Sequence, residues 1–170
     1  MVGQLGHPGA VTPLRLGVAD AGEVLTLQRA AYVTEARAHD DLHLPPLLET
    51  LDETRAALAD PACVSWGLRE AGRLVAAIRL VADGPVGRIG RLIVAPDRQG
   101  HGLASALLLA AEAAAPLEVI EFQLFTGSKS AGPLHLYPKL GYRETHRTPE
   151  NNHELVHFSK PRVRSGGAVR

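Results

Sequence analysis

The chain has 170 residues, a length that suits one domain with a single sizeable hydrophobic core. Hydrophobic residues make up 45% and charged residues 21%, which is ordinary for a globular protein. Lysine plus arginine and aspartate plus glutamate balance at 18 each, so the chain has no net charge with which to gather nucleic acid or an anionic membrane. We therefore expect neither as a partner.

The predicted elements lie between a glycine- and proline-rich arm, 1–13, and a small basic tail, 161–170, both of which we expect to be flexible. Hydrophobic periodicity, helix-breaking residues and turn residues predict the following order of elements between the arm and the tail. It is a strand 14–18, helices 20–38 and 50–60, a hairpin of strands 63–69 and 73–81, a strand 88–94, a helix 102–116, a strand 119–125, a helix 133–140, and strands 142–147 and 153–159. No internal repeat and no second domain is expected.

Two of the helix starts carry a capping-box pattern. Asp20 is followed by Glu23, and Thr50 by Glu53, so each first residue is expected to accept a backbone N–H that its helix leaves free. The segment between these helices, 39–48, is expected to be a loop because Pro45 and Pro46 interrupt it.

The stretch 92–109 reads LIVAPDRQGHGLASALLL, an apolar strand followed by a glycine-bearing loop that opens into a helix. Backbone N–H groups gather at such a helix start and bind anions. Gly100 and Gly102 would let a phosphate approach the main chain closely. Apolar residues at helical spacing would anchor the helix to the core, namely Leu103, Leu107, Leu108 and Ala111.

Two other phosphate-binding designs fit this loop less well. A P-loop needs a lysine and a hydroxyl residue after its second glycine, where this chain has Leu103 and Ala104. The dinucleotide-binding motif GxGxxG requires a third glycine, where this chain has Ser105, although Glu121 lies near the acidic position that the motif expects. A nucleoside triphosphatase and a dinucleotide-binding domain are therefore both disfavoured.

The third design is the acyl-CoA loop Q/R-x-x-G-x-G/A, which Gln99, Gly102 and Ala104 fill. About 30 residues later, 134–142 reads LHLYPKLGY, similar to a second segment, LYxKxGF/Y. In these two elements and in their order, the chain resembles the GCN5-related N-acetyltransferase (GNAT) family over residues 14–160. The resemblance implies an α/β fold whose mixed central sheet is splayed between its fourth and fifth strands, with helices on both faces.

The resemblance also implies the site for acetyl-CoA. In the family, main-chain groups of the strand before the loop pair with the pantetheine arm, and loop N–H groups take the pyrophosphate. The implied cofactor-binding residues are Leu92, Ile93, Val94, Gln99, Gly100, His101, Gly102, Leu103, Ala104 and Ser130. Ser130 stands where the family often has an asparagine, and the His101 side chain either bonds phosphate or faces solvent.

The implied activity is an acetyl-CoA-dependent N-acetyltransfer in which a primary amine attacks the thioester directly. Tyr137, in the second segment, is the candidate acid for the leaving sulfur, because a phenol with a pKa of about 10 is protonated at neutral pH. The alternative is a packed aromatic whose hydroxyl only bonds backbone. Pro133 and Pro138 depart from the family pattern and predict that the helix starts late, which would move the phenol.

The general base is not carried over from the family. Many members have a glutamate on the strand before the loop, where this chain has Gly90. Glu121, on the next predicted strand with Gln123, is an alternative base. It would equally suit a solvated edge or a salt bridge.

The loop from His39 to His43 is the other polar concentration, and the family usually lets this region border the acceptor. Its acids, Asp40 and Asp41, would attract a cationic amine, and a histidine would accept the proton. An exposed acidic loop is the other reading. We expect no metal, because the four-residue spacing of the histidines lacks the HExxH glutamate and a cysteine partner.

The remaining expectations concern the whole protein. A non-catalytic module that uses acyl-CoA occupancy to regulate a partner is the alternative function. The sequence leaves the acceptor open among small-molecule and peptide amines, and a homodimer follows only from family analogy. The lone Cys63 excludes an internal disulfide, no run reaches the ~20 apolar residues of a membrane helix, and no signal pattern is present, so a cytoplasmic location is expected.

Overall fold

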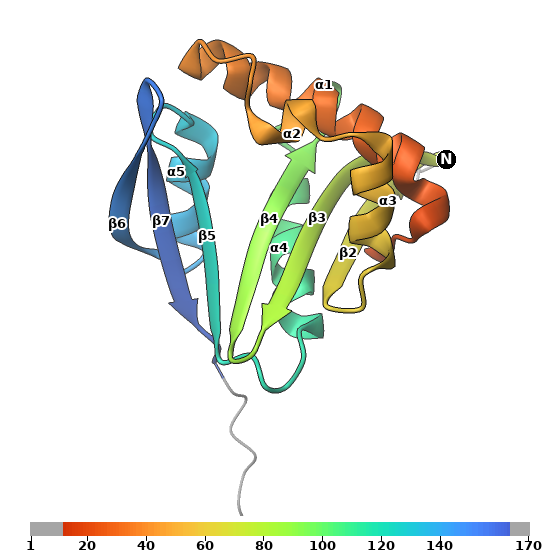
Figure 1. The fold of residues 1–170 in the computed structure, drawn as a ribbon. Coiled ribbons are helices and arrows are strands. Elements are labelled where there is room, and N and C mark those ends of the chain that lie inside the picture. Colours follow the sequence, from red (N-terminus) through yellow and green to blue (C-terminus); the bar gives the residue numbers. More distant parts are fainter. Residues whose placement is uncertain (1–11, 164–170) are drawn as a thin grey trace, which may run out of the picture.

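The computed structural model describes residues 12–163 and is built on a seven-stranded mixed sheet with the order β1-β2-β3-β4-β5-β7-β6 (Figure 1). The strands are β1 Leu14–Arg15, β2 Cys63–Glu70, β3 Arg73–Asp83, β4 Val86–Val94, β5 Glu121–Gly127, β6 Arg143–Glu150 and β7 His153–Pro161. The helices are α1 Ala21–His39, α2 Pro45–Leu48, α3 Leu51–Ala59, α4 Leu103–Ala114 and α5 Ala131–Lys139, with 3₁₀ turns at Val18–Asp20 and Pro96–Arg98. Among these described residues, no helix is both long and apolar enough to cross a bilayer.

The predicted splay between the fourth and fifth strands is confirmed. β4 and β5 run parallel but pair only from Val86 to Arg88, after which β5 continues against β7 (Figure 1). Just beyond the last β4–β5 pair, Arg91 and Leu92 of β4 together face the single residue Ile78 of β3. Such a bulge bends the strand that carries it. It therefore accompanies the point at which β4 turns away from β5.

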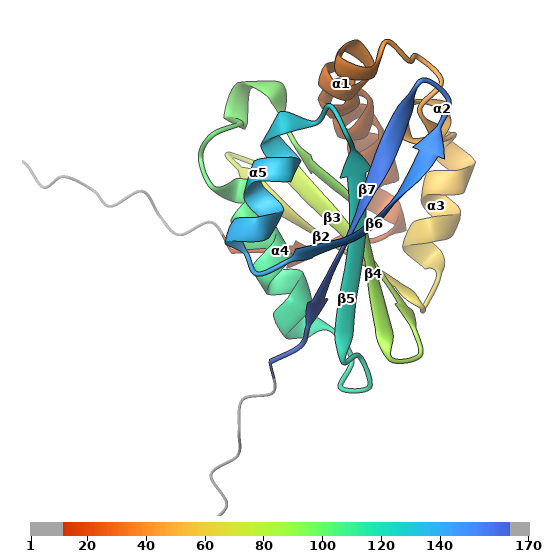
Figure 2. The ribbon, with the colours of Figure 1, turned by 90° about the vertical axis from the view of Figure 1, so that its left-hand side faces the viewer.

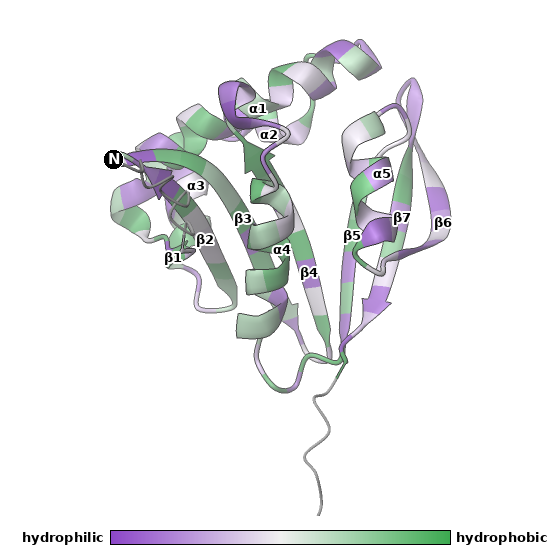
Figure 3. Ribbon diagram, turned by 180° about the vertical axis from the view of Figure 1, so that it is seen from behind, coloured by the Kyte–Doolittle hydropathy of each residue, from purple (hydrophilic) through white to green (hydrophobic). Residues whose placement is uncertain are grey.

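Helices cover both faces of the sheet, as expected. α1 and α3 pack against β2, β3 and β4 on one face, and α4 packs against the same strands on the other. Figure 3 shows α4 and α5 together on the face opposite α1, with α4 over the central strands and α5 beside β5 and β7. The predicted apolar stripe of α4 is confirmed, because its buried residues are Leu103, Leu107, Leu108 and Ala111.

The C-terminal end of α1 extends across the opening to the second half of the sheet (Figures 1 and 2). The His39 ring accepts a hydrogen bond from the main-chain N–H of Lys129 (3.3 Å). The main-chain carbonyl of His39 accepts another from the side-chain amide of Asn152 (2.8 Å). A Cβ at Gly127 would overlap this ring, so glycine is needed for the approach. α1 thus joins the two halves that the splay separates.

One of the two predicted capping boxes is confirmed and the other is not. Thr50 and Glu53 form the predicted capping box, but Asp20 does not cap α1. Its carboxylate instead accepts the Gly17 N–H (2.8 Å) and the Arg69 guanidinium (2.9 Å), because a 3₁₀ turn precedes the helix and turns the side chain back. That turn also limits the first strand to two residues.

Two helices that contain prolines differ from the sequence predictions, one in its existence and the other in its first residue. The predicted loop 39–48 contains α2, whose first two residues are Pro45 and Pro46, positions where the missing N–H is not required. The predicted late start of the helix near Pro133 is wrong. α5 begins at Ala131, so that Pro133 falls in its first turn, and the helix continues through Pro138 to its end one residue later.

The final strand is longer than predicted. β7 extends to Pro161, which pairs with Glu121, and Arg162 donates to the carbonyl of Ala115 at the end of α4 (3.0 Å). Residues 161–163 are therefore part of the ordered domain rather than of a tail. The predicted flexible segments otherwise fall on residues 1–11 and 164–170, which lie outside the described residues.

Candidate functional site

The loop before α4 presents a run of free backbone donors. Within residues 12–163, no N–H group from Gln99 to Ser105 donates a hydrogen bond. Gly100 and Gly102 adopt positive φ values of 77° and 75°, and a Cβ at either would meet nothing within 4 Å. Free N–H groups, the positive end of a helix and open space in front of glycine suit an anion such as a pyrophosphate.

Ion pairs fix this loop to the β2–β3 hairpin. Arg98 pairs with Glu70 through two nitrogens (2.6 and 2.8 Å), and Arg73 donates to Asp97 (2.7 Å). The bond from Arg73 lowers the pKa of Asp97 to about 2, so this carboxylate is charged at neutral pH. These contacts hold the loop in place before any ligand arrives, which lowers the entropic cost of binding.

The His101 side chain folds back onto its own loop. Its Nδ1 lies 2.9 Å from the carbonyl oxygen of Gln99 and 3.2 Å from that of Arg98, while the residue remains exposed. A donor bond from Nδ1 leaves Nε2 as the nitrogen that faces solvent. The structure therefore places His101 as a brace of the loop with one nitrogen still open to a ligand.

β4 presents a free edge beside this loop. Ile93 is buried, and Leu92 and Val94 are half-buried. On the β5 side, no strand of the described chain pairs with these residues, because the ladder ends at Arg88. Main-chain groups of an unpaired strand edge bind an extended ligand as they would bind another strand.

Tyr137 lies on α5 and is 7% exposed. Its ring packs against Tyr142 and Phe158, with ring centroids 6.0 and 5.6 Å apart. Burial raises the pKa of Tyr137, and the nearby Tyr32 and Glu35 raise it further. The phenol is therefore protonated at neutral pH, and its hydroxyl makes no hydrogen bond within the described residues. It is available as a proton donor to a ligand.

Ser130 and Glu35 meet at the open end of the sheet. Ser130 is buried at the start of α5, and its hydroxyl donates a short hydrogen bond to the carboxylate of Glu35 on α1. Sequence analysis missed Glu35, because nothing in the helical pattern distinguishes it from a solvated glutamate. Only the path of α1 across the splayed strands brings it near Tyr137.

The two candidate base positions lie in different places. A Cβ at Gly90 would meet nothing within 4 Å, so this position is open space. Glu121 begins β5 opposite Val86, at the closed end of the splay, and accepts from Gln123 (3.1 Å). Val94 ends the same nine-residue strand that begins at Val86, about 26 Å away at about 3.3 Å per residue.

The structure therefore does not bring Glu121 together with the loop or with Tyr137. Arg88 donates to Gln123 (3.2 Å), so the polar residues of β5 belong to a network at the closed end. This place agrees with the alternative reading of Glu121 as a residue of a polar edge. It does not favour Glu121 as the general base, because proton transfer requires direct contact or one bridging water.

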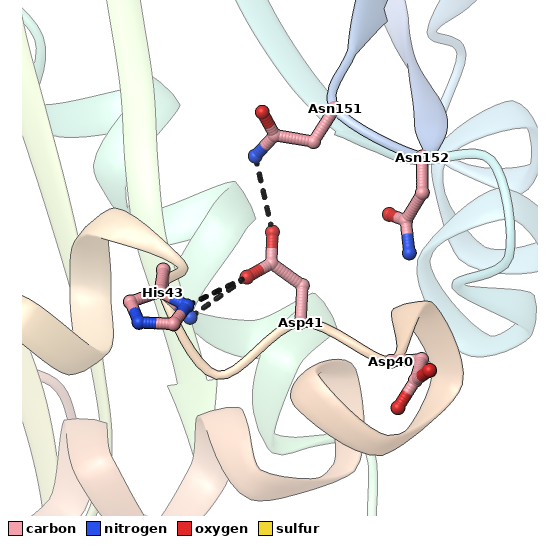
Figure 4. Close-up of a pocket in the computed structure, with 5 residues that line it drawn as sticks. All are labelled: Asp40, Asp41, His43, Asn151 and Asn152. Carbon is pink, nitrogen blue, oxygen red and sulfur yellow. Dashed lines mark hydrogen bonds and ion pairs between the residues drawn. The ribbon is translucent and has the colours of Figure 1, made fainter.

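The acidic loop after α1 borders a polar hollow of about 550 Å³ (Figure 4). Its lining joins this loop to the β6–β7 turn and consists of Asp40, Asp41, His43, Asn151 and Asn152. The Asp41 carboxylate accepts the His43 main-chain N–H (2.7 Å) and the Asn151 amide (3.3 Å), and the first of these bonds chiefly lowers the pKa of Asp41. The hollow therefore carries negative charge at neutral pH.

His39 is not part of that hollow. Lys129 donates its N–H to Nε2, so the ring proton sits on Nδ1, which donates to the carbonyl oxygen of Glu35 (2.9 Å). The ring is buried and packs at a tilt of 51° against His153, with centroids 4.2 Å apart. Because both nitrogens are occupied, His39 holds α1 in place and does not face an incoming amine. His43 is the histidine of this loop that is exposed.

A buried ionic cluster borders β4 on the α1 face, and sequence analysis missed it. Glu49, 8% exposed, accepts from Arg79 (2.9 Å), Arg91 (3.1 Å) and Thr54 (3.0 Å). Burial alone would raise the pKa of Glu49, but the bonds from Arg79 and Thr54 and the charge of Arg91 lower it to about 2. These residues are far apart in the sequence, so no local pattern could have grouped them.

Comparison with known proteins gives a family match. The sequence model of the acetyltransferase (GNAT) family matches residues 26–142, more than half of the chain. No curated protein matches the chain.

Several solved structures share the fold. The ribosomal-protein-alanine N-acetyltransferase of Escherichia coli is 17% identical (TM-score 0.73, covering 95% of this chain and 99% of that one). The PaiA N-acetyltransferase of Thermoplasma acidophilum, in complex with coenzyme A, is 14% identical (0.70, 89% and 99%). A chimeric spermidine N-acetyltransferase from Vibrio cholerae is 17% identical (0.69, 89% and 95%). At these identities the likeness establishes the fold.

Proposed function

The chain belongs to the GNAT family of acetyltransferases, and we propose that it transfers the acetyl group of acetyl-CoA to a primary amine by direct attack of the amine on the thioester. The observation that carries this proposal is the run of free N–H groups from Gln99 to Ser105 beside the unpaired edge of β4. A phosphate-bearing ligand with an extended arm suits both features. Coenzyme A is such a ligand.

In this proposal, the N–H groups from Gln99 to Ala104 bind the pyrophosphate. The main chain of 92–94 pairs with the pantetheine arm, and the N–H of Val94 stabilises charge on the thioester oxygen. The Ser130 hydroxyl already donates to Glu35, so it reaches the arm only as an acceptor or by exchanging that bond. Ser130 therefore contributes less to binding than the loop does.

Tyr137 donates a proton to the departing sulfur. Its buried hydroxyl is protonated at neutral pH and makes no hydrogen bond within the described residues, as a proton donor requires. The amine attacks only after it has lost a proton, because an alkylammonium, with a pKa of about 10, has no free electron pair. Gly90 leaves no carboxylate on β4 for that step, so the proton passes to another group or to water.

The binding step is tested by calorimetry with acetyl-CoA. In Gly102→Ala, the new methyl group enters the space in front of the loop, so we expect at least ~10-fold weaker binding, equal to about 1.4 kcal/mol. Gly84→Ala is the matched control, since Gly84 also has a positive φ and open surroundings but lies in the β3–β4 turn at the closed end. Equal affinity in the two variants would place the ligand elsewhere.

The chemical step is tested with Tyr137→Phe, which removes only the hydroxyl. We expect kcat to fall by about 10²- to 10⁴-fold, the usual contribution of a general acid, while the affinity for acetyl-CoA is retained. Unchanged turnover would show that Tyr137 is only a packed aromatic.

The non-catalytic alternative is favoured by a single feature, the missing carboxylate at Gly90. A panel of amines assayed for release of coenzyme A distinguishes the two functions. The panel includes alanine-ended peptides and spermidine, because two of the solved relatives are named for such acceptors. Tight binding of acetyl-CoA without release by any amine would support the regulatory module.

A further inference from the structure

Two side chains of opposite charge reach the open end of the splayed sheet from opposite sides. Arg91 comes from β4 and Glu35 from α1, and both lie close enough to the Tyr32 hydroxyl for their charges to act on it. Glu35 and Tyr32 in turn act on the Tyr137 hydroxyl. The cation, the anion and the candidate acid therefore lie near one another, around the hydroxyl of Tyr32 on α1.

The backbone directs Arg91 to this region. Arg91 sits in the β-bulge opposite Ile78 and has a left-handed φ of 50°, which is strained for a residue with a side chain. Bulges re-aim side chains out of the regular alternation of a strand. Here the bulge brings the guanidinium to the α1 face, beside Glu49 and Tyr32.

The guanidinium of Arg91 still has binding capacity. Its Nε donates to Glu49, its charge and a hydrogen bond also act on the Tyr32 hydroxyl, and the side chain is 27% exposed. Glu49 is shared with Arg79, so one carboxylate balances two guanidinium groups. A second carboxylate would complete both the hydrogen bonding and the charge, in the bidentate geometry that arginine prefers.

Glu35 offers the opposite capacity. Its side chain is 26% exposed and accepts one hydrogen bond, from Ser130, which leaves most of its acceptor sites open. His39, one turn later on α1, directs its Nδ1 to the main-chain carbonyl oxygen of Glu35 (2.9 Å) and lies farther from the carboxylate (3.9 Å). An ammonium group is the ligand that a free carboxylate of this kind binds.

We propose that the acceptor is an amine that also carries a carboxylate, such as an amino acid or a short peptide. Glu35 binds its ammonium group and Arg91 binds its carboxylate. This inference rests on the proposed acetyltransfer and names the substrate class for it. Neither residue belongs to the motifs that identify the family.

The arrangement also accounts for the protons. The ammonium group held by Glu35 loses one proton to solvent through that carboxylate, and the freed nitrogen forms the C–N bond as the C–S bond breaks. The thiolate takes the proton of Tyr137. The second proton leaves the nitrogen and restores the phenol directly or through water. The net products are the amide, the free thiol and one proton.

The first test compares each amino acid with the amine that its decarboxylation would give, for example alanine with ethylamine, by release of coenzyme A. We expect kcat/KM to favour the amino acid by about 10- to 150-fold, the range for a hydrogen bond to a charged group. Arg91→Gln should abolish this preference mainly through KM. Arg88→Gln, on the same strand but exposed at the closed end, should preserve it.

The second test concerns Glu35. Glu35→Gln should raise KM for every cationic acceptor by a similar factor, with less effect on an aromatic amine that is uncharged at neutral pH. Glu35→Asp should restore part of the loss. Glu118→Gln, an exposed glutamate between α4 and β5, is the control that should change nothing.

The pH profile of kcat/KM is a further readout, which the loss of a purely structural role of Glu35 would leave unchanged. The titratable or charged groups around Glu35 come from α1, β4, α5 and β7, namely Tyr32, His39, Arg91, Tyr137 and His153. We expect the acidic limb of the profile to be altered in Glu35→Gln and unaltered in the Glu118 control.

The outcomes separate the two proposals. Equal use of amines with and without a carboxylate by the unaltered protein would overturn the inference and leave the acetyltransfer intact. Equal losses for both acceptor types in Arg91→Gln would also overturn it. If Arg91→Gln fails to fold, Arg91→Lys is measured instead. Lysine retains the positive charge but cannot make the two parallel hydrogen bonds of a guanidinium, so it should reduce the preference for the amino acid only in part. Absence of any acetylation would refute the proposed function itself.

Discussion

Glu49, which directly follows α2, accepts hydrogen bonds from Arg79 and Arg91 of the central strands and from Thr54 of α3, so its loss has a predictable cost. In Glu49→Gln, Arg79 and Arg91 keep their positive charges but lose their shared counter-charge. Both guanidinium groups are largely buried, with 16% and 27% of their side chains exposed. Removing one member of a buried ion pair destabilises more than the pair itself contributes, because the remaining charge stays desolvated.

The pKa of Glu49 gives the magnitude. A carboxyl whose ordinary pKa of 4.5 falls to about 2 on folding contributes about 3 kcal/mol at neutral pH, at about 1.4 kcal/mol per pH unit. Because the folded-state pKa is the lower one, this stability is fully present above about pH 4.5 and is lost as the pH falls toward 2. We therefore expect Glu49→Gln to be about 3 kcal/mol less stable at pH 7.

Urea unfolding at pH 7, 5, 4 and 3 measures this difference directly. The gap between the unaltered protein and Glu49→Gln should be constant from pH 7 to 5 and should narrow from pH 4 to 3. Glu118→Gln, with an exposed side chain, should match the unaltered protein at every pH. An equally stable variant at pH 7, or a gap that does not depend on pH, would refute the reasoning.

Two further predictions concern contacts that hold the halves of the sheet together. Glu112→Ala leaves Lys160 on β7 without the carboxylate that lies 2.7 Å away, and should cost about 3 kcal/mol in urea unfolding at pH 7; a loss under 1 kcal/mol would contradict a buried pair. Gly127→Ala pushes a methyl group into the His39 ring and should lower the thermal midpoint by several degrees, given that about 1 kcal/mol shifts it by about 2–8 °C. An unchanged midpoint would mean that α1 can shift without cost.

Local sequence predicted the elements that depend on nearby residues. The stripe of Leu103, Leu107, Leu108 and Ala111 predicted how α4 packs, and the Thr50 capping box predicted the start of α3. Gly100 and Gly102 of the loop adopt the positive φ values that glycine favours, and the close approach of a phosphate to their main chain stays a prediction. In each case the physical cause lies within one turn of the chain.

Asp20 shows where local reasoning failed. Its capping pattern is intact in the sequence, but Arg69, on a strand that reaches it only in the folded protein, takes its carboxylate. The same limit applies to Glu121, whose alternating strand pattern could not reveal which end of the splay it occupies.

The sequence by itself thus determined the family, most of the order of the elements and the glycine-bearing loop before α4, because motifs and periodicity are set by residues close together in the chain. Only the tertiary structure decided which charged groups meet. Glu35 reaches Ser130, and Arg91 reaches Glu49, across 95 and 42 residues respectively. A bulge in β4 and the path of α1 over the splayed strands create those contacts, and both arise from packing between distant segments.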